Sequence, residues 1–241
     1  MRKVALLATT AIAAVGVTTP AWAVNADQGL DVSLSPTKAG TKQKPAAVKI
    51  KVKTTTNPKD NVPFATREAV IHFDKALVFN PKKFKTCSAS KIQASESSCP
   101  KGSKVGSGSA IGTAIGQTSN LKVSAFNGPK SKLMLHVTAS TPLQIDAVIQ
   151  ASLKKDKGKY GYKLVVPIPE NLQQPVPGVF ATLKQFVTSV RATSKGVPYV
   201  GLASCPKSKK LHFGGDFTFT DGTKLSATDT VKCKPGKKSK K

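Results

Sequence analysis

The chain has 241 residues, with 38 lysines and arginines against 12 aspartates and glutamates, and its formal net charge at pH 7 is +26. Apart from Arg2, only Arg67 and Arg191 are arginines, so the guanidinium fork that recognises phosphates and bases is nearly absent. This composition argues against a shaped phosphate or base-reading site. It favours diffuse attraction to anionic partners, with a purely solubilising charge as the alternative.

The N-terminus has the features of an export signal. Arg2 and Lys3 precede an apolar run that ends at Val17, and the sequence Thr-Thr-Pro-Ala-Trp-Ala follows, with small residues at positions −3 and −1 of a cleavage site. The run is too short and too rich in alanine and threonine to span a membrane, and no second apolar stretch of membrane length occurs. We therefore expect residues 1–23 to be a signal peptide cleaved after Ala23. The mature protein should be secreted, without a transmembrane segment, and extracellular or associated with the cell wall.

Alternating apolar and polar residues begin after Gly29 and recur along the chain, as in half-buried antiparallel strands. The polar segment 154–158 predicts a hairpin turn. Residues 181–192 fit a helix or a strand, and their β-branched content favours a strand. The segment 167–178 contains closely spaced prolines and should be irregular. The predicted strands cover 30–34, 48–52, 69–73, 77–79, 121–126, 133–137, 145–153 and 160–168.

The last hairpin allows a prediction of register. A two-residue loop at Asp221-Gly222 would place Phe219 opposite Lys224, mixing aromatic and charged side chains on one face. A three-residue loop, 221–223, pairs Phe219 with Leu225 and keeps that face apolar, as burial requires. The same register pairs Phe217 with Ala227 and Phe213 with Val231, and it places Cys233 beside Leu211.

An even number of cysteines in an exported chain indicates disulfides. Of the three possible pairings of Cys87, Cys99, Cys205 and Cys233, we favour Cys87–Cys99 and Cys205–Cys233, because each joins segments close in sequence that resemble neighbouring strands. A zinc site is disfavoured, since its cysteine pairs are normally two to four residues apart.

Ten to twelve short strands punctuated by 16 prolines and 18 glycines predict an all-β fold. We expect an antiparallel β-sandwich, immunoglobulin-like or related, over residues 24–233 and stapled by two disulfides. A division near 139–145 or 169–178 would instead give two packed sub-sandwiches. Residues 234–241 should form a disordered polybasic tail, whose candidate anion-binding residues are Lys234, Lys237, Lys238, Lys240 and Lys241.

No motif for catalysis, a metal or a cofactor is found. His72, His136 and His212 each lie between apolar neighbours, so period two places them on the solvent faces of strands. The glycine-rich stretch 101–110 lacks the spacing of a phosphate-binding loop or of a serine-hydrolase turn, and it predicts a turn leading into a strand of small residues. We expect a non-enzyme. A hydrolase assembled from distant residues, with these histidines, is the least favoured alternative.

Binding signals are few. The only tryptophan, Trp22, would leave with the signal peptide. Tyr160 and Tyr162 are the candidate exposed aromatics, with core packing as the alternative. No motif for specific nucleic-acid recognition occurs.

The segment from Phe84 to Cys87, followed by Cys-Pro-Lys-Gly-Ser-Lys-Val-Gly from Cys99, resembles a pattern of exported proteins of high-GC Gram-positive bacteria. In these actinobacterial proteins a Cys and a Cys-Pro-x-x-Ser-x-Val-Gly stretch bracket a short loop. Pro177-Gly178-Val179, Pro198-Tyr199-Val200 and the hairpin from Phe217 are similar to later parts. The resemblance implies a disulfide-stapled β-sandwich at the cell exterior, and it supplies no active-site residues.

These observations predict a secreted, non-catalytic binding or structural protein. Its lysines would associate with an anionic polymer of the cell envelope or with an acidic protein surface. The alternative is an interaction module with one specific protein partner, for which the basic charge only maintains solubility.

Overall fold

The computed structural model describes residues 26–59 and 64–236. The predicted signal peptide and the last five residues of the predicted tail lie outside these ranges. The described chain is nearly all strand, and its strands are antiparallel. The predicted all-β class is therefore confirmed.

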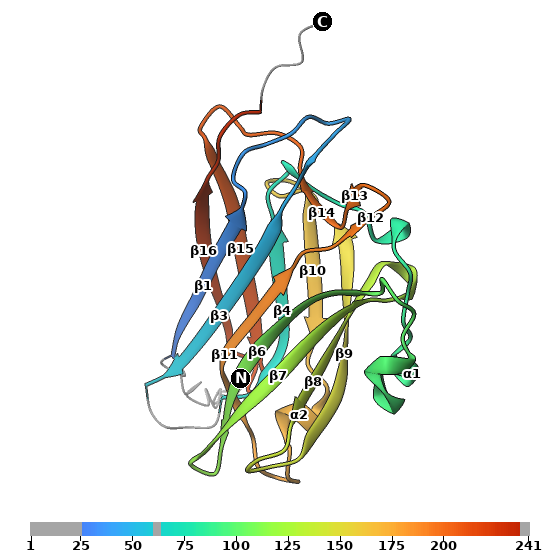
Figure 1. Ribbon diagram of the computed structural model, residues 1–241. Coiled ribbons are helices and arrows are strands. Elements are labelled where there is room, and N and C mark those ends of the chain that lie inside the picture. Colours follow the sequence, from blue (N-terminus) through green and yellow to red (C-terminus); the bar gives the residue numbers. More distant parts are fainter. Residues whose placement is uncertain (1–25, 60–63, 237–241) are drawn as a thin grey trace, which may run out of the picture.

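Eleven strands form one continuous sheet, in the order β1-β3-β11-β6-β7-β8-β9-β10-β4-β15-β16 (Figure 1). Every strand predicted from alternation is present, and residues 181–192 contain a strand rather than a helix. The bounds in chain order are β1 (Ala26–Ser35), β3 (Lys49–Pro58), β4 (Thr66–Phe73), β6 (Lys104–Ala114), β7 (Gln117–Asn127), β8 (Lys132–Ala139), β9 (Ile145–Lys155), β10 (Tyr162–Pro167), β11 (Thr182–Val190), β15 (Lys210–Phe219) and β16 (Lys224–Lys232).

The sheet rolls up so that its two edge strands, β1 and β16, lie side by side. Because the number of strands is odd and neighbours are antiparallel, these two strands run in the same direction where they meet. A parallel bridge joins Lys38 to Lys234 just beyond their ends. Lower down, the backbone N–H of Val32 donates to Oδ2 of Asp229 at 2.6 Å. A side chain thus supplies a hydrogen bond across this seam.

Short elements cover the two ends and one side of the rolled sheet (Figure 1). A small sheet of β2 (Ala46–Ala47), β14 (Val200–Leu202) and β5 (Leu77–Phe79) covers the upper end, and the β12–β13 pair (Thr193–Ser194, Val197–Pro198) precedes β14. The segment with α2 (Glu170–Gln173) lies at the lower end, and α1 (Ala89–Ala94) packs outside β8 and β9. Three turns of 3-10 helix cover Pro81–Lys83, Glu96–Ser98 and Pro129–Ser131.

One main hydrophobic cluster lies inside the rolled sheet, and the two halves of the sheet face each other across it. A second, smaller cluster lies under α1, around Ile92 and Met134. Both predicted disulfides, Cys87–Cys99 and Cys205–Cys233, are present. Of the two predicted divisions, 139–145 connects the neighbouring strands β8 and β9, whereas 169–178 connects β10 to β11, which belong to the same sheet but are not neighbours in it.

The predicted register of the last hairpin is wrong by two residues. Phe217 pairs with Leu225, and Cys233 donates its N–H to the carbonyl of Lys209 rather than lying beside Leu211. The loop has three residues but is 220–222, since the Phe219 N–H donates to the Thr223 carbonyl. Gly222 adopts φ +89°, a left-handed conformation that suits glycine at the end of such a loop. A shift of two residues leaves every side chain on its predicted face, so the requirement for one apolar face does not distinguish the two registers.

The predicted tail begins too early. Lys234 is not part of a free tail, because its N–H donates to the Thr37 carbonyl and its own carbonyl accepts from Ala39 N–H. The prediction for the glycine-rich stretch is confirmed, since a turn at Lys101 and Gly102 leads into β6, which begins at Lys104. α1 was not predicted; it is a helix of six residues capped at its N-terminus by Ser88, whose side chain accepts a hydrogen bond from Lys91 N–H.

Candidate functional site

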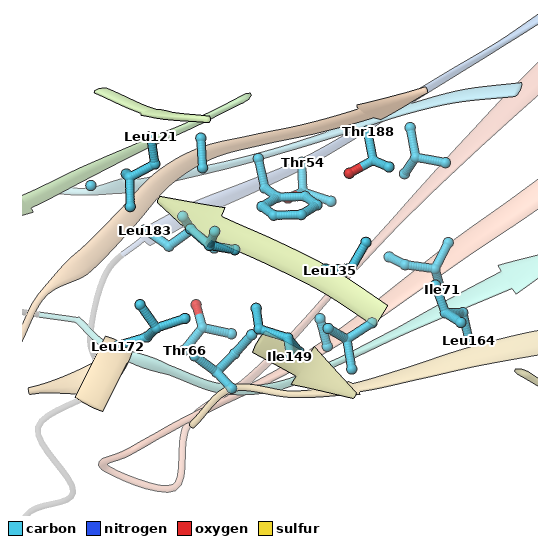
Figure 2. A pocket seen from close by; sticks show the side chains of 18 of the residues that line it. Thr54, Thr66, Ile71, Leu121, Leu135, Ile149, Leu164, Leu172, Leu183 and Thr188 are labelled. Atoms are coloured by element: carbon cyan, nitrogen blue, oxygen red, sulfur yellow. The ribbon is translucent and has the colours of Figure 1, made fainter. Parts of the chain in front are cut away.

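An internal cavity of about 170 Å³ lies inside the rolled sheet. Its lining comes from strands all around the sheet, and Figure 2 shows Ile71, Leu121, Leu135, Ile149 and Leu164 among the side chains that surround it. Engineered cavities of about 150 Å³ with an apolar lining stay dry and bind benzene or xenon. The cavity is therefore large enough for a small organic molecule.

Two features of the sheet leave this space open. Closed sheets of about eight strands have an interior that side chains just fill, and this sheet has eleven strands. In addition, β6 presents a row of small residues to the interior. Of these, Ala110, Gly112 and Ala114 line the cavity. Gly106 and Gly108 belong to the same row, and a Cβ at either would collide with the backbone of β11. The glycines thus permit close approach of two strands and contribute no side chain to the interior.

Polarity changes along the cavity. The upper half is lined by aliphatic and aromatic side chains such as Ile50, Phe73 and Val190. The lower half combines leucines such as Leu172 and Leu183 with hydroxyl groups, because several positions near the lower strand ends are threonines or serine. Two of these hydroxyls are already engaged, since Thr56 donates to the Gln28 side chain at 2.8 Å and Thr182 accepts from Phe64 N–H at 2.8 Å. The hydroxyl-bearing residues near the lower end are Thr54, Thr56, Thr66, Ser119 and Thr182.

No aspartate, glutamate, lysine, arginine or histidine of the two described ranges lines the cavity. The titratable residue in the wall is Tyr199, at the upper end. Burial raises the pKa of its phenol above the ordinary value, and its hydroxyl donates to Oδ1 of Asn127 at 3.2 Å. Tyr199 therefore stays neutral, and the wall carries no charge.

Thr188 stands apart from the other hydroxyl residues in the wall. Its side chain is buried, with 8% of the residue exposed, and it lies on β11 between Val52 of β3 and Gly108 of β6. Within residues 26–59 and 64–236, its Oγ1 is the one buried side-chain polar atom without a hydrogen-bond partner. In Figure 2 its oxygen is directed towards the side on which Thr54 lies.

The segment that joins β10 to β11 closes the lower end of the cavity. Leu172 and Pro175 contribute to the lining from this segment. A backbone hydrogen bond from Ile168 N–H to the Arg67 carbonyl, at 2.9 Å, holds it to β4, and a second from Ala181 N–H to the Gln173 carbonyl, at 2.8 Å, closes the segment on itself. The proline-rich stretch predicted to be irregular thus forms a cover, with one short helical turn.

The histidines were predicted to lie on the solvent faces of their strands. His136 does point away from the interior, but it is buried, with 7% exposed, under the loop closed by Cys87–Cys99. Its Nδ1 lies 2.9 Å from a Glu96 carboxylate oxygen and its Nε2 lies 2.9 Å from Asp146. An imidazole donates both of these bonds only when both nitrogens carry hydrogen. Through its contacts with Glu96 and Asp146, His136 joins this loop to β9.

The Glu96 carboxylate is held in its ionised form. Burial alone would raise its pKa, but hydrogen bonds from Ser124, Lys104 and His136, together with the charge of Lys104, outweigh burial and lower the pKa to about 2. The Lys104 ammonium lies 3.0 Å from Glu96. These contacts tie a structural loop to the sheet and lie outside the cavity.

His72 lies in a similar bridge. Its Nδ1 is 2.6 Å from Asp156 and its Nε2 is 3.0 Å from Asp216. The pKa of Asp156 is lowered, because hydrogen bonds from His72 and from a backbone N–H outweigh the effect of burial. Tyr160, a candidate exposed aromatic, packs its ring 5.0 Å from that of His72. His212, the third predicted histidine, is half-buried, and its backbone N–H donates to Asp74.

Tyr162, the second candidate aromatic, is half-buried and contacts the Phe79 ring edge to face. The Lys155 ammonium lies 4.0 Å from the Tyr162 ring centre and 2.6 Å from its hydroxyl. Both tyrosines therefore have intramolecular partners. Of the five predicted anion-binding lysines, only Lys234 is within the described ranges.

The cavity itself was missed by sequence reasoning. The signal for it in the sequence is the row of small residues at alternate positions of β6. No group of three or more metal-ligating side chains lies together in the described part of the chain. No helix there is both long enough and apolar enough to cross a membrane.

Comparison with known proteins assigns no family. No family model matches the chain, and no curated protein or solved structure is significantly similar to it.

Proposed function

We propose that this protein is a secreted, non-catalytic binding protein that encloses a small, uncharged, apolar molecule inside its rolled sheet. The observation that carries the proposal is the cavity of about 170 Å³ with an uncharged and largely aliphatic lining. A well-formed apolar pocket with a few polar groups is the usual form of a small-molecule site. Two disulfides suit an oxidising compartment, as does the predicted export signal.

The volume limits the size of the ligand. Pockets for drug-sized ligands have volumes of about 300–1,000 Å³. A space of about 170 Å³ is close to the roughly 150 Å³ that accommodates benzene, so a single ring or a short branched chain fits and a long lipid does not.

The lining limits the charge of the ligand. An ionised group moved from water into this cavity would lose its hydration and find no opposite charge in the wall. We therefore expect the protein to discriminate strongly between an apolar ring and the same ring with a carboxylate.

The test is a thermal-unfolding series with the purified protein and three probes: benzene, methylcyclohexane and cyclohexanecarboxylate. A ligand that binds only the folded state stabilises it, by about 2.7 kcal/mol at a free concentration of 100 times Kd. We expect concentration-dependent stabilisation by the two neutral probes and none by the carboxylate. Equal shifts with all three probes, or no shift with any, would overturn the proposal.

We further propose that the lysine-rich exterior associates with anionic polymers of the cell envelope. Lys49, Lys51 and Lys53 project outward at alternate positions of β3. Across the described residues, only three lysines have a carboxylate within 4.0 Å, namely Lys59, Lys104 and Lys163. Most of the positive charge therefore has no intramolecular acidic partner and is available to a polyanion.

Salt dependence tests this second proposal. The mature protein should be retained on a polyanion column and elute at much higher salt than a neutral control, because counterion release makes such binding steeply salt-dependent. Replacing Lys49, Lys51 and Lys53 together by glutamine should shift elution to lower salt. Elution with the neutral control would contradict the proposal, and a partner captured independently of salt would favour the specific protein partner considered above.

A further inference from the structure

The buried hydroxyl of Thr188 points to a more specific ligand class than the cavity alone. Buried polar side-chain atoms in folded proteins nearly always have a hydrogen-bond partner, so an exception calls for an explanation. Within the described residues, Oγ1 of Thr188 is the only exception, and Thr188 belongs to the cavity wall.

The neighbours of Thr188 account for its missing partner. The residues opposite it on the adjacent strands are Val52 and Gly108, and neither has a polar side chain. Of the interior hydroxyls, Thr56 and Thr182 already have partners near the lower end, which distinguishes them from Thr188.

From these contacts we infer that Thr188 is the polar anchor of the cavity and that the natural ligand is a neutral, mainly hydrocarbon molecule carrying one uncharged oxygen, a hydroxyl or a carbonyl. The threonine hydroxyl donates to either oxygen after rotation about its Cβ–Oγ1 bond, and the aliphatic wall surrounds the hydrocarbon part. This inference rests on the proposed function, because it requires that a ligand occupies the cavity.

A double-mutant cycle tests the anchor with two probes of nearly equal shape, cyclohexanol and methylcyclohexane, in which a hydroxyl replaces a methyl group. Affinities are measured by calorimetry for the wild type and for T188V and T188S. Valine preserves the shape of threonine without its hydroxyl, and serine retains the hydroxyl. For each protein, the affinity for cyclohexanol is divided by the affinity for methylcyclohexane. Comparing this ratio between a variant and the wild type isolates the hydrogen bond, because the different hydration of the two probes is the same in both experiments.

We expect T188V to reduce the relative preference for cyclohexanol by about three- to tenfold, the usual net effect of one hydrogen bond, while its affinity for methylcyclohexane stays equal or rises. T188S should keep the wild-type preference. Binding of both probes with an unchanged ratio in T188V would overturn the inference and leave the proposed function standing. Binding of neither probe to the wild type would overturn the proposed function, and the anchor with it. Thermal unfolding of each variant without ligand confirms that it is folded.

Discussion

Replacing Ala110 by leucine tests whether the space inside the rolled sheet is empty. Ala110 is on β6, is 2% exposed and contributes to the lining of the cavity. At roughly 24 cal/mol per Å³, an empty volume of 170 Å³ costs about 4 kcal/mol of stability. Leucine adds three carbon atoms, which at about 0.8 kcal/mol each would recover about 2.4 kcal/mol without strain. Allowing for strain against Leu121 and Phe186 on the neighbouring strands, we expect a stability gain of about 1–2 kcal/mol.

The matched control is Ser109→Leu, which adds a similar volume at the neighbouring position. Ser109 is exposed on the outer face of the same strand, so its replacement should change stability by no more than about 0.5 kcal/mol. A milder second variant is Gly112→Ala, because an added Cβ there meets its nearest atom, Leu121 Cδ1, at 3.7 Å, an ordinary contact.

The assay combines urea unfolding with benzene binding. A gain of 1–2 kcal/mol corresponds to a rise in Tm of about 2–8 °C for a domain of this size. Ala110→Leu should bind benzene at least about tenfold more weakly than the wild type, whereas Ser109→Leu should bind it unchanged. A loss of stability together with unchanged benzene binding would refute the reasoning, because it would mean that the space beside Ala110 is not the ligand cavity.

Three further predictions concern the frame around the cavity. The pKa of Glu96 is lowered from 4.5 to about 2 in the folded protein, so its stabilising contribution is complete above about pH 4.5 and is lost as the pH falls towards 2. In urea unfolding at a series of pH values, Glu96→Gln should therefore reduce the dependence of stability on pH in this range. The same substitution at the exposed Glu170 should leave that dependence unchanged. Replacing Cys205 and Cys233 together by serine should lower the free energy of unfolding by about 3–4 kcal/mol, measured with the wild type under non-reducing conditions; a change below about 1 kcal/mol would contradict the role given to this bridge. Asp229→Ala removes the carboxylate that accepts a hydrogen bond from Val32 N–H across the seam, and it should lower the free energy of unfolding by about 1.5–3 kcal/mol. Hydrogen exchange at the Val32 amide should become faster. Unchanged exchange would show that the seam does not depend on this bond.

Alternation along the strands was sufficient to predict which side chains face the interior. Val32, Leu34 and Ile50 are buried as expected, and the lysines of β3 lie outside. The spacing of the cysteines also predicted both disulfides. These features are local, because a period of two and a short separation in sequence are visible in a single segment.

The features that were missed depend on relations between distant segments. The register of the last hairpin was wrong by two, because any even shift preserves the faces of Phe217 and Leu225. His136 was placed on the correct face, but the loop that buries it follows from the path of residues 87–99 over β8. The cavity depends on how many strands close the sheet and on which small residues meet across it, and neither follows from one strand alone.

The central claim is that the interior of the rolled sheet is an apolar site for a small neutral molecule. The most direct test is a crystal structure of the mature protein determined under xenon pressure, since xenon enters dry apolar cavities. The account predicts a xenon atom within the cavity, among Ile71, Leu135 and Ile149. An interior already filled by side chains or by ordered water, with xenon bound only at the surface, would contradict it.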